Sequence, residues 1–110
     1  MIIYYRLEIP NELEVEFYRK ANGTIPVMNY LQSINKKIGA KVFSEIELLE
    51  KHGINLREPY VKPIRGKRYK GIYELRIKQS SNILRILYYV CNRRKFILLH
   101  GFLKRLMQYL

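Results

Sequence analysis

Cysteine is almost absent from this 110-residue chain, since Cys91 is the only one. A single cysteine excludes an internal disulfide and fits a reducing compartment. No uninterrupted apolar run approaches the ~20 residues that a membrane-spanning helix needs. The opening MIIYYRLEIPNE contains Glu8 and Pro10, so it makes a poor signal peptide. We therefore expect a soluble cytoplasmic protein that does not bind membranes.

Acidic residues are scarce in the second half of the chain. Residues 60–110 hold thirteen Lys or Arg and one acid, Glu74, whereas residues 1–59 hold eight of each sign. The whole net charge of +12 thus belongs to the second half. Such asymmetry indicates a polyanionic partner, with nucleic acid first and an acidic protein second.

The same scarcity limits the possible chemistry. With one carboxylate in the basic half, and His and Cys not at ligand spacing, the sequence argues against a metal site and against a paired-carboxylate hydrolase. No P-loop, Rossmann glycine pattern or nucleophile elbow is present. We expect neither a metal nor a cofactor.

The length predicts one domain over residues 1–110, with residues 1–12 as a possible extra N-terminal segment. Residues 2–9 could be a strand or a leader. A first helix is expected after Thr24, a possible cap, with Pro26 in its first turn. A second helix is expected from about Gly39 to His52, and Gly53 should end it. Alternating or β-rich patterns predict strands at 13–20, 60–66, 72–78, 83–90 and 95–102. The tail from residue 103 could begin a short helix.

The expected order is therefore one strand, two helices and four strands in a meander. Hairpin-length connections make neighbouring strands antiparallel. We predict an α+β fold in which two N-terminal helices pack on a mainly antiparallel twisted sheet.

Two arginines in the middle of apolar strands suggest a functional site. A symmetric turn at Ser80–Ser81 places Arg76 opposite Arg85, and a turn at Asn92–Arg93 places Arg85 opposite His100. Glu74 and Lys78 should lie nearby on the same face. The opposite face, expected under the helices, collects Tyr73, Leu75, Ile77, Leu84, Ile86, Tyr88, Val90, Ile97 and Leu99.

Facing cations destabilise a sheet, so Arg76 and Arg85 need compensation. A bound phosphate held by two guanidinium groups would provide it. In the alternative, Glu74 pairs with one arginine and the other reaches solvent.

Phosphate chemistry without a metal suits RNA, whose 2′-hydroxyl is an internal nucleophile. Arg76 and Arg85 would stabilise the transition-state charge, and His100 could transfer protons because its ordinary pKa is about 6.5. Lys104 could act as an acid or a phosphate ligand. Flanking phosphates would bind Lys62, Arg65, Lys67, Arg68 and Lys70, with Tyr69 or Tyr73 available for stacking on bases.

The segments PVMNYLQSI, AKVFSEIELLEKHG, KPIRGKRYKGIYELRI, NILRILYYV and ILLHGFLKR together resemble the RelE/HigB superfamily of toxins from bacterial toxin–antitoxin systems, in its phage-derived, HigB-like branch. The resemblance implies a RelE/ParE-like fold and a toxin that enters the ribosomal A site and cuts translated mRNA. It also implies neutralisation by a helix-turn-helix antitoxin. By position it assigns the catalytic residues to Arg76, Arg85, His100 and Lys104.

Two alternatives stay open. One is a gyrase-directed toxin of the related ParE type, because one fold can host different functions. The other is a non-catalytic or inactive RNA-binding relative, for which the positive charge alone would suffice. The chain stops at RLMQYL, where relatives continue, and this leaves an inactive remnant among the alternatives.

Overall fold

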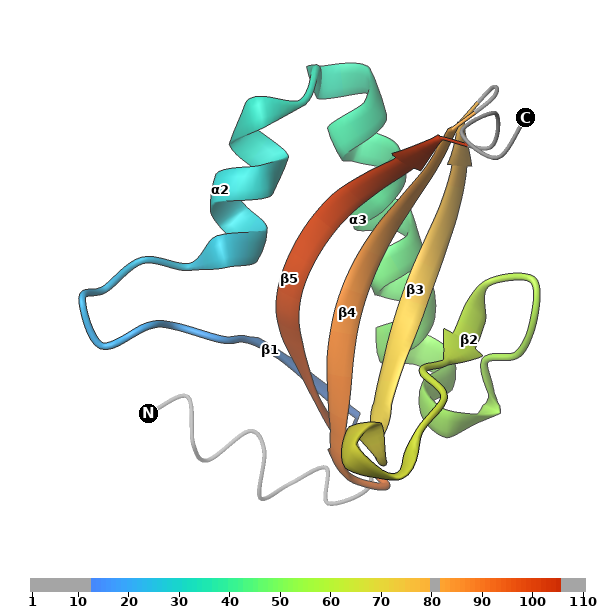
Figure 1. Ribbon diagram of the computed structural model, residues 1–110. Coiled ribbons are helices and arrows are strands. Elements are labelled where there is room, and N and C mark those ends of the chain that lie inside the picture. The colour runs from blue at the N-terminus through green and yellow to red at the C-terminus, as the bar shows by residue number, and fades with distance from the viewer. Residues whose placement is uncertain (1–12, 80–81, 106–110) are drawn as a thin grey trace.

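The computed structural model describes residues 13–79 and 82–105 (Figure 1). Along the chain the regular elements are β1 (Glu14–Phe17), α2 (Pro26–Ser33), α3 (Lys36–His52), β2 (Val61–Pro63), β3 (Ile72–Gln79), β4 (Asn82–Asn92) and β5 (Lys95–Arg105). Two short 3-10 turns, η1 (Gly53–Asn55) and η2 (Lys67–Tyr69), flank β2. The predicted order of one strand, two helices and four strands is confirmed.

The five strands form one mixed sheet in the order β1-β5-β4-β3-β2. The strands β2 to β5 pair antiparallel, but β1 runs parallel to β5, with Glu14 opposite Lys95 and Phe17 opposite Leu98. The predicted fold, with two N-terminal helices on a mainly antiparallel sheet, is therefore wrong: the helices follow the first strand and the sheet is mixed. Hairpin reasoning applies only to strands joined by short turns, whereas most of the chain separates β1 from β5.

Both helices begin at signals that differ from those expected. Pro26 occupies the first turn of α2 as predicted, but the residue at the N-cap is Ile25, so Thr24 is not the cap. Helix α3 starts at Lys36, before the predicted Gly39, because the Asn35 side chain accepts a 2.9 Å hydrogen bond from the backbone N–H of Ile38. Gly53, with φ of 55°, ends α3 as expected.

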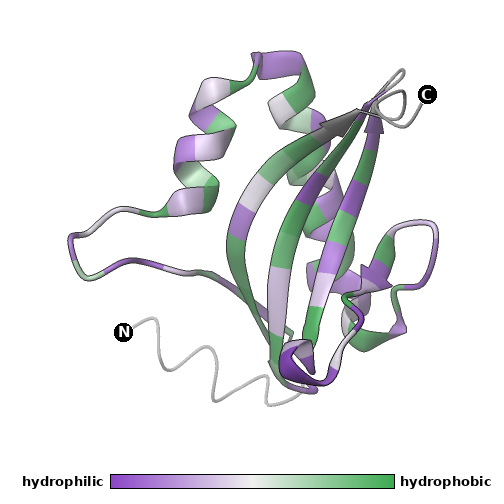
Figure 2. Ribbon diagram, in the orientation of Figure 1, coloured by the Kyte–Doolittle hydropathy of each residue, from purple (hydrophilic) through white to green (hydrophobic). Residues whose placement is uncertain are grey.

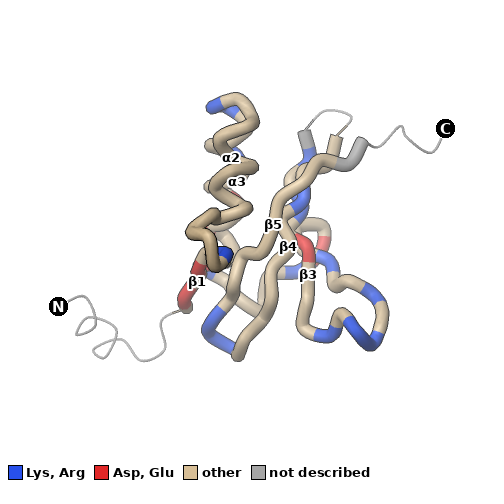
Figure 3. The backbone as a smooth tube through the Cα atoms, turned by 60° about the vertical axis from the view of Figure 1, so that its left-hand side comes forward, with Lys and Arg blue, Asp and Glu red and all other residues tan. Residues whose placement is uncertain are grey.

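The helices cover one face of the sheet and leave the other open, as Figure 3 shows. Polar and apolar residues alternate along β3, whose apolar face packs against the helices, whereas β4 is mostly apolar (Figure 2). The buried core between the layers consists of Val27, Leu31, Val42, Ile46, Leu49, Leu56, Val61, Leu75, Ile77, Leu84, Ile86, Tyr88, Phe96 and Leu98.

The predicted inward face of the last strand is wrong, since Phe96 and Leu98 are buried in place of Ile97 and Leu99. Asn92 pairs with Lys95, so the turn is centred one residue later than expected, and a register shift follows between Val90 and Asn92. A one-residue slip exchanges the two faces of a strand. A second shift, where Leu87 pairs with His100 and Tyr88 with Leu98, exchanges them again.

Gly101 allows α2 to lie close against β5. A Cβ atom at this position would overlap the Tyr30 ring and lie 2.9 Å from Cδ1 of Ile86. Glycine at this position therefore permits the close approach of an aromatic side chain of α2.

The predicted helix at the C-terminus is wrong for residues 103–105, which continue β5. Residues 106–110, and the possible strand or leader at 2–9, lie outside the described residues. Within residues 13–79 and 82–105, neither helix combines the length and the apolar content that crossing a membrane requires.

Candidate nucleic-acid interface

The open face of the sheet carries the two arginines singled out by the sequence. Arg76 on β3 and Arg85 on β4 face each other in the register, which confirms the predicted pairing. Each alternates with buried residues that point toward the helices, namely Leu75 and Ile77 on β3 and Leu84 and Ile86 on β4. The two guanidinium groups therefore lie on the face opposite the core.

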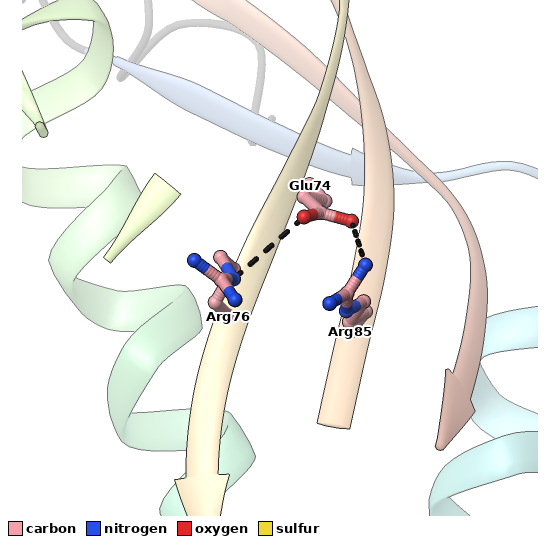
Figure 4. Close-up of polar contacts among 3 residues, drawn as sticks. All are labelled: Glu74, Arg76 and Arg85. Atoms are coloured by element: carbon pink, nitrogen blue, oxygen red, sulfur yellow. Dashed lines mark hydrogen bonds and ion pairs between the residues drawn. The ribbon is translucent and has the colours of Figure 1, made fainter. Parts of the chain in front are cut away.

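Glu74 lies between these arginines and contacts both of them (Figure 4). Its Oε2 accepts a 3.1 Å hydrogen bond from Nη1 of Arg85, and its Oε1 lies 3.6 Å from Nε of Arg76. Glu74 is only 4% exposed, and it is the one buried charged residue within residues 13–79 and 82–105. We call Glu74, Arg76 and Arg85 the arginine–glutamate cluster.

This contact changes the expected charge balance. Like charges on facing strands repel, and we expected either a bound phosphate or a bond from Glu74 to one arginine. Instead the carboxylate bridges both guanidinium groups, so the cluster carries one net positive charge. Burying a carboxylate is costly unless it is paired, and here two cations provide the pairing.

Several donors of the cluster remain available. Glu74 accepts a hydrogen bond from Nη1 of Arg85, whereas its 3.6 Å contact with Nε of Arg76 is an ion pair and leaves this buried Nε without a hydrogen-bond partner among the described residues. Among the described residues neither Nη group of Arg76 has a hydrogen-bond partner, and the buried Nε of Arg85 has none either. Beside Arg76 lies a hollow of about 210 Å³, lined by Pro59, Arg76, Lys78 and Ile83. Two cationic side chains thus border a space on the open face.

His100 lies on the open face, but it is not in line with the arginines. It is exposed and pairs with Leu87, while Phe102 pairs with Arg85. The predicted row of Arg76, Arg85 and His100 is therefore wrong: the turn is centred one residue later than expected, which moves each partner on β5 by two positions, and the two later register shifts cancel each other. The row across the sheet that contains His100 is Lys62, Glu74, Leu87 and His100.

Lys104 pairs with Ile83 through the backbone of β5, two residues beyond Phe102. The residue before it on β5, Leu103, pairs with Leu84. Along the backbone of β5, His100 and Lys104 therefore lie on either side of Phe102, the partner of Arg85.

The basic loop between β2 and β3 is exposed, as Figure 3 shows. Gly66 and Gly71 bound it, with φ of 115° and 87°, values that favour glycine. Arg65, Lys67, Arg68 and Lys70 are exposed in this loop, whereas Lys62 is half-buried on β2 opposite Glu74.

The two tyrosines considered for stacking occupy different places. Tyr69 is 43% exposed, and the guanidinium carbon of Arg68 lies 5.8 Å from the centre of its ring. Tyr73 instead stacks on Tyr88 with ring centres 5.7 Å apart, and it packs against the core. The structure therefore brings Tyr69, and not Tyr73, to the exposed basic loop.

A further hollow, of about 330 Å³, lies on the side of the sheet that the helices cover. Its lining is Gly53, Ile54, Leu56, Arg57, Glu58, Val61, Pro63, Tyr73, Tyr88, Val90 and Phe96. Burial raises the pKa of the Tyr88 hydroxyl, with a smaller contribution from Tyr73, so this hydroxyl stays protonated. The hollow is mostly apolar and lies apart from the arginine–glutamate cluster.

A known protein family matches most of this chain. The family described as "Phage derived protein Gp49-like (DUF891)" matches residues 29–108. The chain belongs to this family. The Gp49-like match includes the end of α2, all of α3, the basic loop and the cluster, and it supports the phage-derived part of the resemblance. No curated protein matches the chain.

Within this Gp49-like chain, Glu74 is a residue that sequence reasoning placed beside the arginines but did not assign to the site. Two signals point to its contact with them: it is the only acid in residues 60–110, and it lies two positions from Arg76, on the same face of a strand. No group of three His, Cys, Asp or Glu side chains within the described part of the chain could hold a metal ion.

Proposed function

We propose that this Gp49-like protein is the toxin of a toxin–antitoxin system and acts as a ribosome-dependent, metal-independent mRNA endoribonuclease of the RelE/HigB type. The observation that carries the proposal is the pair of arginines on the open sheet face, held by Glu74 and bordered by a cationic hollow. The net charge of +12 and the phage-derived family support it.

The proposed reaction uses the ribose 2′-hydroxyl of the RNA as the nucleophile. A base removes its proton, the 2′-oxygen bonds to the adjacent phosphorus, and the bond to the 5′-oxygen breaks as that oxygen takes up a proton. The products are a 2′,3′-cyclic phosphate and a 5′-hydroxyl end. Negative charge grows on the phosphate oxygens in the transition state, where Arg76 and Arg85 would stabilise it.

Proton transfer falls to His100 and Lys104 in this scheme. The imidazole of His100 is a side chain that can both give and take a proton. Its exposed position on the same face as the cluster keeps it available to substrate. Lys104 would serve as an acid or as a phosphate ligand.

The basic loop would hold the RNA on either side of the cut. Arg65, Lys67, Arg68 and Lys70 are exposed and can bind flanking phosphates of mRNA or of ribosomal RNA in the A site. Tyr69 offers an aromatic face on which a base can stack. Lys62 would contribute charge from β2.

A cognate helix-turn-helix antitoxin is the proposed protein partner. A cationic face that binds RNA is also complementary to an acidic protein surface, which would cover it and stop cleavage. Expression of the Gp49-like protein alone should therefore slow growth, and co-expression of the neighbouring antitoxin gene should restore it.

The test is a purified translation reaction with defined mRNA. Wild-type protein should cut the mRNA within its reading frame, and the Arg85→Ala variant should cut far more slowly. The Glu47→Gln variant, changed at an exposed position on α3, serves as a matched control. Intact mRNA with wild-type protein would refute the proposal.

A non-catalytic RNA-binding protein is the second candidate. The observation that favours it is that His100 pairs with Leu87 instead of Arg85. Tight RNA binding without any cleavage would support this candidate. A ParE-like action on gyrase would instead produce DNA damage signalling in cells whose mRNA remains intact.

A further inference from the structure

The arginine–glutamate cluster contains an internal counter-ion in a site that would bind anions. A carboxylate competes with phosphate for guanidinium donors, so a surface built only to attract RNA would gain from losing it. Glu74 nevertheless lies between both arginines on the open face of the sheet, where the surrounding side chains bury it. This position indicates that Glu74 has a role other than attracting RNA.

The contacts show which donors Glu74 occupies. It takes one Nη of Arg85 and lies near Nε of Arg76. These contacts leave the terminal nitrogens of Arg76 and the second terminal nitrogen of Arg85 without partners among the described residues. A long arginine side chain that is free in solvent samples many rotamers, and fixing it in advance lowers the entropy cost of binding.

We propose that Glu74 is a positioning residue of the RNA site, whose carboxylate holds Arg76 and Arg85 side by side so that their remaining N–H donors converge on a single phosphate group. This inference rests on the proposed function. It adds that the cluster works through the geometry of its donors and not through the amount of positive charge.

A role in attraction and a role in positioning predict opposite effects of Glu74→Gln on the rate of cleavage. The substitution keeps the size of the side chain but removes its charge, so the cluster gains one net positive charge. If attraction alone mattered, both RNA binding and cleavage would improve. If Glu74 positions the arginines, RNA should bind as tightly as before or more tightly, while cleavage slows, because misplacement of a catalytic group by about 1 Å can cost about 100-fold.

The experiment separates these outcomes with single-turnover cleavage on programmed ribosomes. At saturating protein, Glu74→Gln should cleave about 100-fold more slowly than wild type, while its affinity for an RNA oligonucleotide does not weaken. Glu47→Gln, which removes the same charge from an exposed site on α3, should cleave like wild type. Cleavage by Glu74→Gln at the wild-type rate would overturn the proposal.

A second readout follows the arginines directly. In wild type, the side-chain Nε–Hε signals of Arg76 and Arg85 should be ordered in nuclear magnetic resonance spectra, and Glu74→Gln should make them mobile. If the amide variant does not fold, Glu74→Asp carries the test, since its shorter side chain keeps the charge but cannot reach both arginines. Equally mobile signals in wild type would also overturn the proposal.

The two ideas fail separately. Wild-type protein that cuts no mRNA would refute the proposed nuclease, while the resonance measurement would still show whether Glu74 orders the guanidinium groups. Wild-type protein that cuts mRNA, together with a fully active Glu74→Gln variant, would refute only the positioning role.

Discussion

Arg85 donates a 3.1 Å hydrogen bond to Glu74, although the two residues are not partners in the strand register. Glu74 faces Leu87, and Arg85 faces Arg76, so the contact runs diagonally from β4 to β3. Diagonal neighbours on a sheet are within reach of long side chains. This geometry lets a single carboxylate serve two cations that face each other.

The diagonal bond should be visible in stability. Arg85→Met removes the hydrogen-bonded partner of a buried carboxylate, and we expect a loss of about 2 kcal/mol in the free energy of unfolding. The double variant Glu74→Gln/Arg85→Met leaves no buried charge at these two positions and should lose less. Urea unfolding of both variants tests this. A double variant as unstable as the single one would show that the pairing does not matter for stability.

Two glycines should respond in opposite ways to alanine. At Gly101 a Cβ atom would overlap the Tyr30 ring, so Gly101→Ala should lower stability by about 1–3 kcal/mol. At Gly39 a Cβ atom meets nothing within 4 Å, so Gly39→Ala in helix α3 should raise stability by about 0.5–1 kcal/mol. Thermal unfolding of the two variants provides the comparison, and a stabilising Gly101→Ala would contradict the described packing of α2.

His100→Ala should separate catalysis from folding. His100 is exposed, so its removal should change the free energy of unfolding by less than about 0.5 kcal/mol. If His100 transfers protons in the proposed reaction, cleavage should fall by about 100-fold or more while RNA affinity is kept. Unchanged cleavage would remove His100 from the mechanism and leave the arginines as the main catalytic groups.

Glu45 on α3 should make stability depend on pH. Burial raises the pKa of its carboxyl above the ordinary value of 4.5, and Lys41 lowers that pKa by a smaller amount. Its Oε2 is buried without a partner among the described residues. A raised pKa favours the protonated form in the folded state, so the stabilisation is complete below pH 4.5 and is lost as the pH rises through the pKa of the folded protein.

Glu45→Gln should therefore be more stable than wild type at neutral pH, and the difference should shrink in acid. Thermal unfolding of both proteins, from neutral to acid pH, measures this difference in stability. A constant difference at all pH values would show that the carboxyl does not titrate differently in the folded and unfolded states.

The sequence predicted the register of β3 and β4 correctly, because a symmetric turn at Ser80–Ser81 was the right assumption and polar and apolar residues alternate regularly along β3. The pairing of Arg76 with Arg85 followed from that turn alone. The next hairpin failed because its turn is centred one residue later than expected, which changes the partner of His100, and because the bulges that bury Phe96 and Leu98 leave no mark in FILLHGF, where nearly every residue is apolar. His100 was therefore assigned to the correct face but to the wrong partner.

The parallel partner of β1 could not be read from its own pattern. Alternation of Leu13, Val15 and Phe17 indicates a half-buried strand, but it carries no information about which distant strand lies beside it. For Glu74 the sequence offered a bond to one arginine but not the bridge to both, because register considers only residues directly opposite one another and the contact with Arg85 is diagonal.

The parallel pairing of β1 with β5 has a consequence for how the molecule assembles. The residues that pair with Glu14–Phe17 of β1 are Lys95–Leu98 of β5, far along the chain. β1 therefore cannot pair until β5 has been synthesised. Closing so long a loop is entropically costly, and folds rich in distant contacts form slowly. Docking of β1 is therefore expected late in folding, after the β3–β4–β5 meander has formed.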